Sequence, residues 1–376
     1  MQYIKLGEVI SSAKVDRCGD NDYPVLSITK SEGLMLQSDK FKKRIASNDT
    51  NQYKVVKKGQ LVQGIHIDEA NFGIQSLVEE GIVSPAYKIW DVNTEMIVPK
   101  YLEILLRSPR SIRYYSSKFN GSIKRRERIT DNDFLSMVIP CPSMTEQQYA
   151  VDIVEKVRKL ILLRKTEIEK HDELIKARFV EMFIDKGYPQ KKVHDVLETA
   201  FWLMPATPEF VIDGEVPYIT SKNIKNRKID FENVKYISKE SFFNISSNRP
   251  TQIGDILVSM IGTLGQTAVI TDDRLFYGQN LYLLRLDNSI IDTDYFCEFF
   301  NSDLTQHELQ GQRNQSTQAY LKANHVEGLS IPMPPLAKQK QFAAFVQQVD
   351  KSKVAVQKAL DEAQLLFDSL MQNYFG

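Results

Sequence analysis

Ile139-Pro-Cys-Pro-Ser-Met-Thr-Glu-Gln147 returns in altered form as Ile331-Pro-Met-Pro-Pro-Leu-Ala-Lys-Gln339. The offset is 192 residues, about half of the 376-residue chain, and the alignment continues without a gap to Phe183 and Phe375. Only nine of these 45 aligned pairs are identical, so the repeat rests mainly on shared periodicity. Self-similarity at a fixed offset predicts two copies of one structural unit.

Apolar residues recur every seven positions in both copies, in two interleaved rows. This spacing is typical of the a/d seam of an amphipathic helix that packs against a partner helix. In the second copy the rows are Phe342, Val349, Val356, Ala363 and Leu370, and Val346, Leu360, Phe367 and Tyr374, interrupted by Lys353. In the first copy they are Val154, Ile161, Ile168, Ile175 and Met182, and Ala150 and Val157, the latter row then interrupted by Arg164, His171 and Arg178.

The prolines before each helix mark its beginning, because proline ends a strand readily and cannot continue a ladder. Thr145 with Gln148 three residues later predicts a capping box for the first helix, whereas the second has Ala337 at the cap position. Helices of roughly 38 to 40 residues would be about 60 Å long. Alone they would indicate only an exposed coiled coil or bundle. The repeat favours an antiparallel pair with a pseudo-twofold axis.

The segments before the two helices resemble each other more faintly. Lys5–Val9 opens the first and Lys192–Val196 the second, and short β-rich runs bounded by Gly, Asn and Asp dominate both. We therefore predict an α+β fold of two mixed α/β domains, related by a pseudo-twofold axis and separated by two long helices that form an antiparallel coiled coil. The predicted boundaries are residues 1–143 for the first domain, 144–187 for the central helix, 188–336 for the second domain and 337–376 for the C-terminal helix.

Composition excludes several classes of protein. Lys plus Arg equals Asp plus Glu at 48 each, so attraction to nucleic acid must come from local patches. The three cysteines are far apart and form no CxxC pair, which argues against disulfides and zinc. No run approaches the roughly 18 apolar residues of a membrane span, and the start lacks a signal-peptide pattern. We expect a cytoplasmic protein with no membrane partner.

Gly254–Gly265, followed about 70 residues later by Ile331–Gln339 and a long helix, resembles the specificity subunit of Type I restriction-modification systems. The order domain, helix, domain, helix is also the plan of that family. The resemblance implies two target-recognition domains, each binding one half of a bipartite site in double-stranded DNA. It also implies that the helices act as a spacer and as the docking surface for two methyltransferase subunits, which restriction subunits would join. Gly59–Gly64 lacks the Gly-Thr-x-Gly turn, so the first domain departs from the pattern.

Basic residues concentrate between Arg107 and Arg128, where Glu127 is the only acid. Such a run suits contact with phosphates, although basic runs are also common on solvated faces. The equivalent stretch of the second domain, Gly311–Gln318, is rich in amides that suit base edges, or it is an ordinary polar loop. A further basic cluster, Lys222–Lys228, suits phosphate contact. The predicted DNA-binding residues are Lys118, Asn120, Lys124, Arg125, Arg126, Arg128, Lys222, Asn223, Lys225, Arg313, Asn314, Gln315, Ser316, Thr317 and Gln318.

Catalytic motifs are missing from the sequence. The five histidines have no metal-ligand spacing, no GxSxG elbow occurs, and Gly262–Gly265 lacks the ending of a phosphate-binding loop, so a tight turn is expected there. We predict a non-catalytic DNA-recognition subunit with no cofactor and no metal. Two alternatives stay open: an enzyme, nuclease or methyltransferase, with an unrecognised active site, and a coiled-coil scaffold that does not bind DNA.

Overall fold

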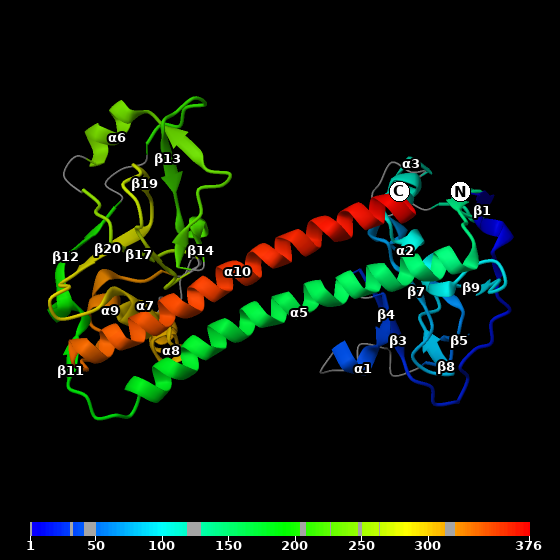
Figure 1. Cartoon of the computed structure of the whole chain (residues 1–376), viewed down its shortest axis with the longest axis horizontal. Helices are drawn as coiled ribbons and strands as arrows, with labels where there is room; N and C mark the ends of the chain where they lie inside the picture. The colour runs from blue at the N-terminus through cyan, green and yellow to red at the C-terminus, as the bar shows by residue number, and fades with distance from the viewer. Residues whose placement is uncertain are drawn as a thin grey trace. The chain divides into compact units, whose positions relative to one another are not determined.

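The structure is a computed structural model that describes residues 2–30, 33–40, 50–118, 129–203, 208–225, 227–246, 250–262, 264–312 and 320–376. The chain divides into two compact units (Figure 1). Unit 1 comprises residues 1–165 and 358–376, and unit 2 comprises residues 166–357. Each unit therefore contains a β-rich body together with part of both long helices. Among the described residues, no helix is both long and apolar enough to cross a membrane.

The two long helices are α5 (Met144–Phe183) and α10 (Leu336–Phe375), each of 40 residues. The predicted capping box of α5 is wrong by two residues. Ser143, not Thr145, caps the helix: its Oγ accepts from the Glu146 backbone N–H at 3.3 Å, and the Glu146 carboxylate accepts from the Ser143 N–H at 2.9 Å. Ser143 directly follows Pro142, so the chain enters the helix as soon as the proline constraint ends.

Within each unit, α5 and α10 run in opposite directions. In unit 1 the Arg158 guanidinium lies 5.7 Å from the centre of the Phe367 ring. In unit 2 the Lys353 ammonium lies 2.6 Å from the Asp172 carboxylate, and the Phe183 and Phe342 rings are 5.4 Å apart. Most residues of the predicted apolar rows are buried: Ala150, Val154, Val157, Ile161, Leu360 and Ala363 in unit 1, and Ile175, Phe342, Val346, Val349 and Val356 in unit 2. Toward the C-terminal end of each helix the prediction is off by one or more positions, because Phe179, Phe183, Met371 and Phe375 are buried whereas Met182, Phe367, Leu370 and Tyr374 are only partly buried.

Each β-rich body is built on a four-stranded antiparallel sheet with the same strand order. In unit 1 the order is β2 (Ile10–Ser12), β9 (Lys88–Val92), β6 (Leu61–Gln63) and β7 (Phe72–Ile74). In unit 2 it is β12 (Leu197–Trp202), β20 (Leu281–Leu286), β17 (Ile256–Ser259) and β18 (Thr267–Val269). A turn with a glycine precedes β6 in unit 1 and β17 in unit 2. The glycines, Gly59 and Gly254, have left-handed φ values of 89° and 94°.

The remaining repeated elements also occur in the same order. A two-stranded ladder joins the start of each body to the strand before its long helix: β1 (Tyr3–Lys5) with β10 (Val138–Pro140), and β11 (Gln190–Lys192) with β21 (Ser330–Pro332). Three short helices recur as α2 (Pro99–Leu106), α3 (Pro109–Lys118) and α4 (Asp131–Leu135) in unit 1, and as α7 (Thr293–Asn301), α8 (Asp303–Gln312) and α9 (Ala323–Glu327) in unit 2. These pairs confirm the predicted duplication and the mixed α/β composition of both units.

One fully buried glutamine in each unit ties the long helix to the body. Its side chain accepts one backbone N–H and donates to two backbone carbonyls. In unit 1, Gln147 accepts from Val98 at 2.8 Å and donates to Met96 at 3.1 Å and Pro142 at 2.8 Å. In unit 2, Gln339 accepts from Asp292 at 2.9 Å and donates to Ile290 at 3.2 Å and Pro334 at 2.8 Å. The repeat is therefore preserved at the level of single hydrogen bonds.

The units differ outside these shared elements. Unit 1 adds the hairpin β3 (Leu26–Thr29) and β4 (Gly33–Leu36), the short helix α1 (Gln37–Lys40), and the pair β5 (Lys54–Lys57) and β8 (Glu80–Val83). Unit 2 adds the hairpin β14 (Ile224–Lys225) and β15 (Lys228–Ile229), the sheet β16 (Lys235–Ile237), β13 (Val216–Ile219) and β19 (Tyr277–Gly278), and helix α6 (Lys239–Ser246).

Candidate nucleic-acid interface

The two loops predicted to contact DNA occupy equivalent places in the two units. One follows α3 and precedes α4, and the other follows α8 and precedes α9. Most of the predicted residues on them lie outside the described residues: Asn120, Lys124, Arg125, Arg126 and Arg128 in unit 1, and Arg313, Asn314, Gln315, Ser316, Thr317 and Gln318 in unit 2. What the structure describes is the framework that holds the two ends of each loop.

In unit 2 this framework includes the turn between β17 and β18. Gly262 and Gly265 adopt left-handed φ values of 87° and 72°, which glycine adopts without strain, so the predicted tight turn is confirmed. Gln306 of α8 donates from Nε2 to the Gly265 carbonyl at 3.1 Å. Ile261 forms a β-bridge with Tyr320, the first described residue after the loop. The turn thus contacts the elements on both sides of the amide-rich segment.

In unit 1 the corresponding connection between β6 and β7 is longer. It contains a 3-10 turn, Ile67–Glu69, followed by Ala70 with a left-handed φ of 58°. This turn packs against α3, the helix that leads into the basic loop. The departure of the first unit from the Gly-Thr-x-Gly pattern, seen at Gly59–Gly64, therefore goes with a different turn between β6 and β7.

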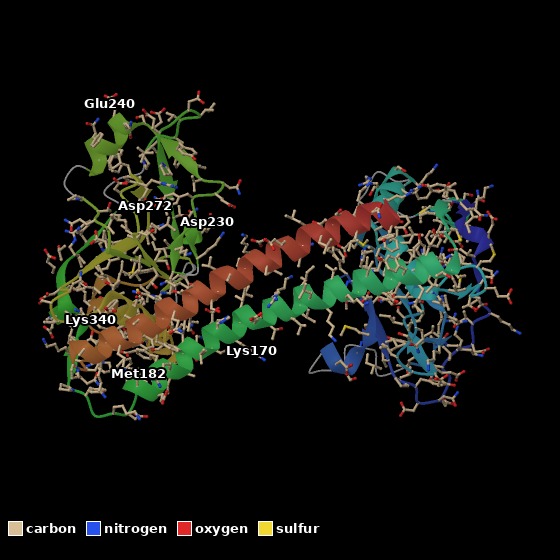
Figure 2. All side chains as sticks on the ribbon, viewed as in Figure 1. Lys170, Met182, Asp230, Glu240, Asp272 and Lys340 are labelled. Carbon is tan, nitrogen blue, oxygen red and sulfur yellow. The ribbon has the colours of Figure 1, made fainter. Side chains whose placement is uncertain are left out.

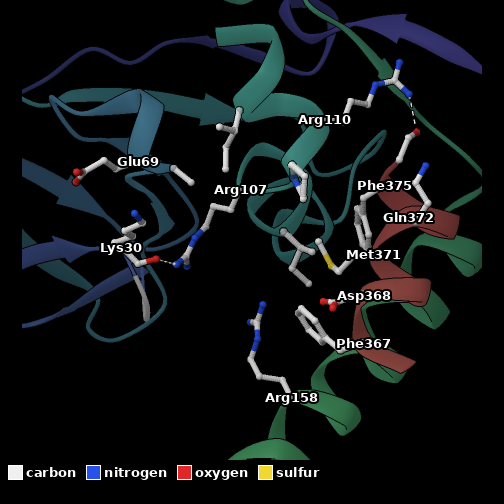
Figure 3. A pocket seen from close by; sticks show the side chains of 15 residues that line it. Lys30, Glu69, Arg107, Arg110, Arg158, Phe367, Asp368, Met371, Gln372 and Phe375 are labelled. Atoms are coloured by element: carbon white, nitrogen blue, oxygen red, sulfur yellow. Dashed lines mark hydrogen bonds between the residues drawn. The ribbon is translucent and has the colours of Figure 1, made fainter. Parts of the chain in front are cut away.

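The described basic residues of the run that begins at Arg107 separate into two groups. Arg107 donates to the Lys30 carbonyl at 2.6 Å, and Arg110 donates to the Gly376 carbonyl at 2.8 Å. Figure 3 shows both arginines in a pocket of about 670 Å³ beside the last turns of α10. These two guanidinium groups are engaged within the chain, contrary to the phosphate contact that the basic run suggested.

Arg113 and Lys118 form the second group, since both are exposed on α3. The Lys118 ammonium lies 5.9 Å from the centre of the Tyr114 ring, a cation–π distance. Lys118 is the last residue of α3, so its side chain is presented where the basic loop begins. Of the described basic residues in this run, these two are the ones placed for an external anion.

The basic cluster of unit 2 is also divided by its contacts. Lys222, Lys225 and Lys228 are all exposed, but Lys225 lies 2.7 Å from Asp230, which Figure 2 shows beside β14. Both the amide oxygen and the amide nitrogen of Asn223 are engaged within the turn: Oδ1 accepts from the Thr220 N–H at 3.0 Å, and Nδ2 donates to the Asp230 carbonyl at 3.0 Å. Asn223 therefore shapes the segment that presents the lysines.

Sequence reasoning missed two buried acids next to these clusters. Glu103 on α2 and Glu298 on α7 are only 5% and 8% exposed, and each binds an arginine. Their signal in the sequence was a single carboxylate inside an apolar helical run, since buried charges need a partner. Without the fold, the partner could not be identified.

Two of the cysteines are poorly suited to nucleophilic chemistry. Burial raises the pKa of the Cys297 thiol to about 12 and also raises the pKa of Cys141, which disfavours the nucleophilic thiolate in both cases. Within the described ranges, no group of three His, Cys, Asp or Glu side chains could hold a metal ion. The described residues hold the elements that flank the basic and the amide-rich segments.

A family model described as the Type I restriction modification DNA specificity domain matches residues 186–363. Residues 186–363 are therefore similar to a Type I restriction modification DNA specificity domain. The matched residues contain the body of unit 2, with its glycine turn, and most of α10.

A curated relative is also similar to part of the chain. The chain is 27% identical over 168 residues to a putative Type I restriction enzyme specificity subunit, MjaX, of Methanocaldococcus jannaschii. That match covers 42% of this chain and 39% of the relative, so the chain matches well under half of the curated relative's length.

Two solved structures share the fold across the whole chain. A chain from a study of complex assembly and conformational transition of the Type I R-M system has a TM-score of 0.60 at 19% identity, covering 100% of this chain and 97% of the other. The Type I restriction-modification S subunit of M. genitalium has a TM-score of 0.58 at 12% identity, covering 100% and 96%. At these identities the likeness concerns the fold alone.

Proposed function

We propose that this chain is the DNA sequence-specificity subunit of a Type I restriction-modification complex, and that each unit reads one half of a bipartite site. The observation that carries the proposal is the duplicated framework. In both units an α-helix, which leads to the segment proposed to contact DNA, lies beside a turn of the central sheet. Two equivalent surfaces on one chain would suit a target with two parts.

The recognition residues that we propose differ in kind between the units. In unit 1, Lys118 and the basic loop would neutralise phosphates, which positions the protein without reading sequence. In unit 2, the amides and Arg313 would bind base edges, while the lysines around β14 would contact the backbone. The proposed residues are Lys118, Asn120, Lys124, Arg125, Arg126 and Arg128, and Lys222, Asn223, Lys225, Arg313, Asn314, Gln315, Ser316, Thr317 and Gln318.

The helices would set the spacing of the half-sites and dock two methyltransferase subunits, which restriction subunits would join. Two pairs of exposed apolar residues on the helices support the docking role, because the members of each pair are equivalent at the repeat offset. Leu162 and Val354 are 64% and 63% exposed, and Leu174 and Leu366 are both 49% exposed. Each unit thus contains one residue from each of these equivalent pairs. Unit 1 contains Leu162 and Leu366, and unit 2 contains Val354 and Leu174.

We predict that Leu162→Asp with Leu366→Asp reduces the number of bound methyltransferase subunits from two to one. A charge on a desolvated apolar contact is costly, and the unit 2 pair stays intact. Mass measurement of the reconstituted complex gives the stoichiometry. Lys159→Asp, on the same helix and also exposed, is the control and should leave two subunits bound. Two subunits bound to the double variant would exclude the leucines from docking.

The test of the proposed function is reconstitution. The purified chain should neither methylate nor cleave DNA when it is incubated with magnesium and S-adenosylmethionine. Addition of its methyltransferase subunit should produce methylation at a single bipartite sequence, read by sequencing of modified bases. Activity of the chain alone would identify an enzyme. Methylation that does not depend on the chain, together with a lack of salt-dependent DNA binding, would identify a scaffold.

A further inference from the structure

An arginine in the β14–β15 hairpin forms two ion pairs inside unit 2. Arg227 donates to Glu298 Oε1 at 2.7 Å and to Asp294 Oδ1 at 2.9 Å, both on α7. The Arg227 side chain is 23% exposed, and that of Glu298 is 10% exposed. A guanidinium held by two carboxylates in such a site could reach a phosphate only by leaving a buried acid without its partner.

The backbone of Arg227 is constrained as well. Its φ is 62°, in the left-handed region that residues other than glycine seldom adopt. Its carbonyl accepts from the Val269 N–H of β18 at 3.2 Å. A residue persists in this conformation when its surroundings over-determine it. The side chain and the backbone of Arg227 together fix the hairpin against edge strand β18 and α7. Arg227 stands between the exposed Lys222 and Lys228 in the sequence.

Unit 1 has a similar connection, but there the arginine follows the helix and the hairpin contributes a backbone carbonyl. There the buried acid is Glu103 of α2, which accepts from Arg107 at 3.3 Å and faces the Ile74 N–H of edge strand β7 at 3.4 Å. Arg107 in turn donates to the Lys30 carbonyl, where the β3–β4 hairpin turns. In both units, an arginine–glutamate pair thus ties a hairpin to the helix behind the edge strand.

We propose that Arg227 is a positioning residue, whose ion pairs with Glu298 and Asp294 hold the β14–β15 hairpin and its lysines in the conformation that contacts DNA. Arg107 and Glu103 serve the β3–β4 hairpin of unit 1 in the same way. The inference rests on the proposed function, because it assumes that the lysines meet phosphates. It removes Arg227 itself from the set of phosphate contacts.

The two roles of Arg227 predict opposite signs for one double variant, Glu298→Gln with Asp294→Asn. If Arg227 contacts phosphate, removal of its acidic partners frees a positive charge and DNA binding tightens. If Arg227 is a positioning residue, the hairpin loses its anchor and binding weakens by about tenfold, the size of a lost DNA contact. The control, Asp303→Asn with Glu308→Gln, removes two exposed acids of α8 and should leave affinity unchanged or slightly raised.

The measurement uses the full chain assembled with its methyltransferase subunit and a duplex that carries the sequence methylated in the host. Hydrogen exchange provides the local readout: the Val269 and Asp230 amides, which bond to Arg227 and Asn223, should exchange faster in the double variant. The Leu283 amide in the middle of β20 should stay protected. Binding as tight as wild type, with unchanged exchange at Val269, would overturn the inference.

A second variant covers the case in which the double variant does not fold. Arg227→Lys keeps the charge but lacks the planar fork with which Arg227 donates to Glu298 and Asp294 from two different nitrogens. A positioning role predicts an intermediate loss of affinity, whereas a phosphate contact, which lysine also makes, predicts wild-type affinity. If the wild-type assembly does not bind the duplex specifically, the proposed function fails, which is distinct from failure of the inference.

Discussion

Replacement of Gln147 by Leu is expected to destabilise unit 1 by about 3 to 5 kcal/mol, because three backbone groups lose their buried partner. These groups are the Val98 N–H and the Met96 and Pro142 carbonyls. Leucine fills a similar volume but bonds to none of them. The same change at Gln339 should destabilise unit 2 by a similar amount, since its three bonds are equivalent.

The adjacent Gln148 is the matched control. It is exposed and bonds only to Asp152, so Gln148→Leu should change stability by no more than about 0.5 kcal/mol. The chain has two tryptophans, Trp90 in unit 1 and Trp202 in unit 2. Urea unfolding followed by Trp90 fluorescence in a Trp202→Phe background reports on unit 1 alone. Equal stabilities of the Gln147 and Gln148 variants would show that the bonds contribute nothing.

The second large effect is expected in DNA binding, when the basic loop of unit 1 is neutralised. Replacing Lys124, Arg125, Arg126 and Arg128 with Ala should weaken binding to all sequences. It should also flatten the salt dependence by about 0.9 in the log–log slope for each phosphate contact that is lost. Binding titrations at several salt concentrations, on specific and unrelated duplexes, measure both quantities.

The amide set of unit 2 is the comparison. Replacing Gln315, Thr317 and Gln318 with Ala should relax discrimination in one half-site by roughly 1 to 3 kcal/mol for each lost bidentate contact, with the salt slope nearly unchanged. Competition between duplexes that differ at single positions of that half-site gives the discrimination. If the basic and amide variants behaved alike, the division between phosphate contact and base reading would be wrong.

The repeated architecture could be predicted because its signals are local and periodic. The heptad rows predicted most of the buried positions of α5 and α10, except near their C-terminal ends, and the offset of 192 residues predicted two equivalent bodies. The cap of α5 was misplaced because Ser143 and Thr145 both offer a hydroxyl three residues before Glu or Gln. Which hydroxyl caps the helix depends on where the backbone leaves the strand, and residue types alone do not record this.

The proposed recognition surface was predictable only in part. Runs of Lys and Arg show where charge is available, but a charge can be used inside the chain as readily as outside it. Arg107, Arg110 and Arg227 belong to basic clusters in the sequence, yet in the fold they bind Glu103, carbonyl groups or Glu298. A pairing between residues 71 positions apart, such as Arg227 with Glu298, leaves no periodic trace.

The sequence by itself determined the duplication, the long helices and the absence of known catalytic motifs, because helical periodicity and motif spacing are properties of neighbouring residues. Only the tertiary structure decided which polar side chains are free to meet a ligand. Burial makes an unpaired charge costly, so each buried glutamate retains an arginine that the linear pattern had left available for DNA. The same physical requirement keeps Gln147 and Gln339 inside the units, where an amide completes three backbone hydrogen bonds that an apolar residue cannot.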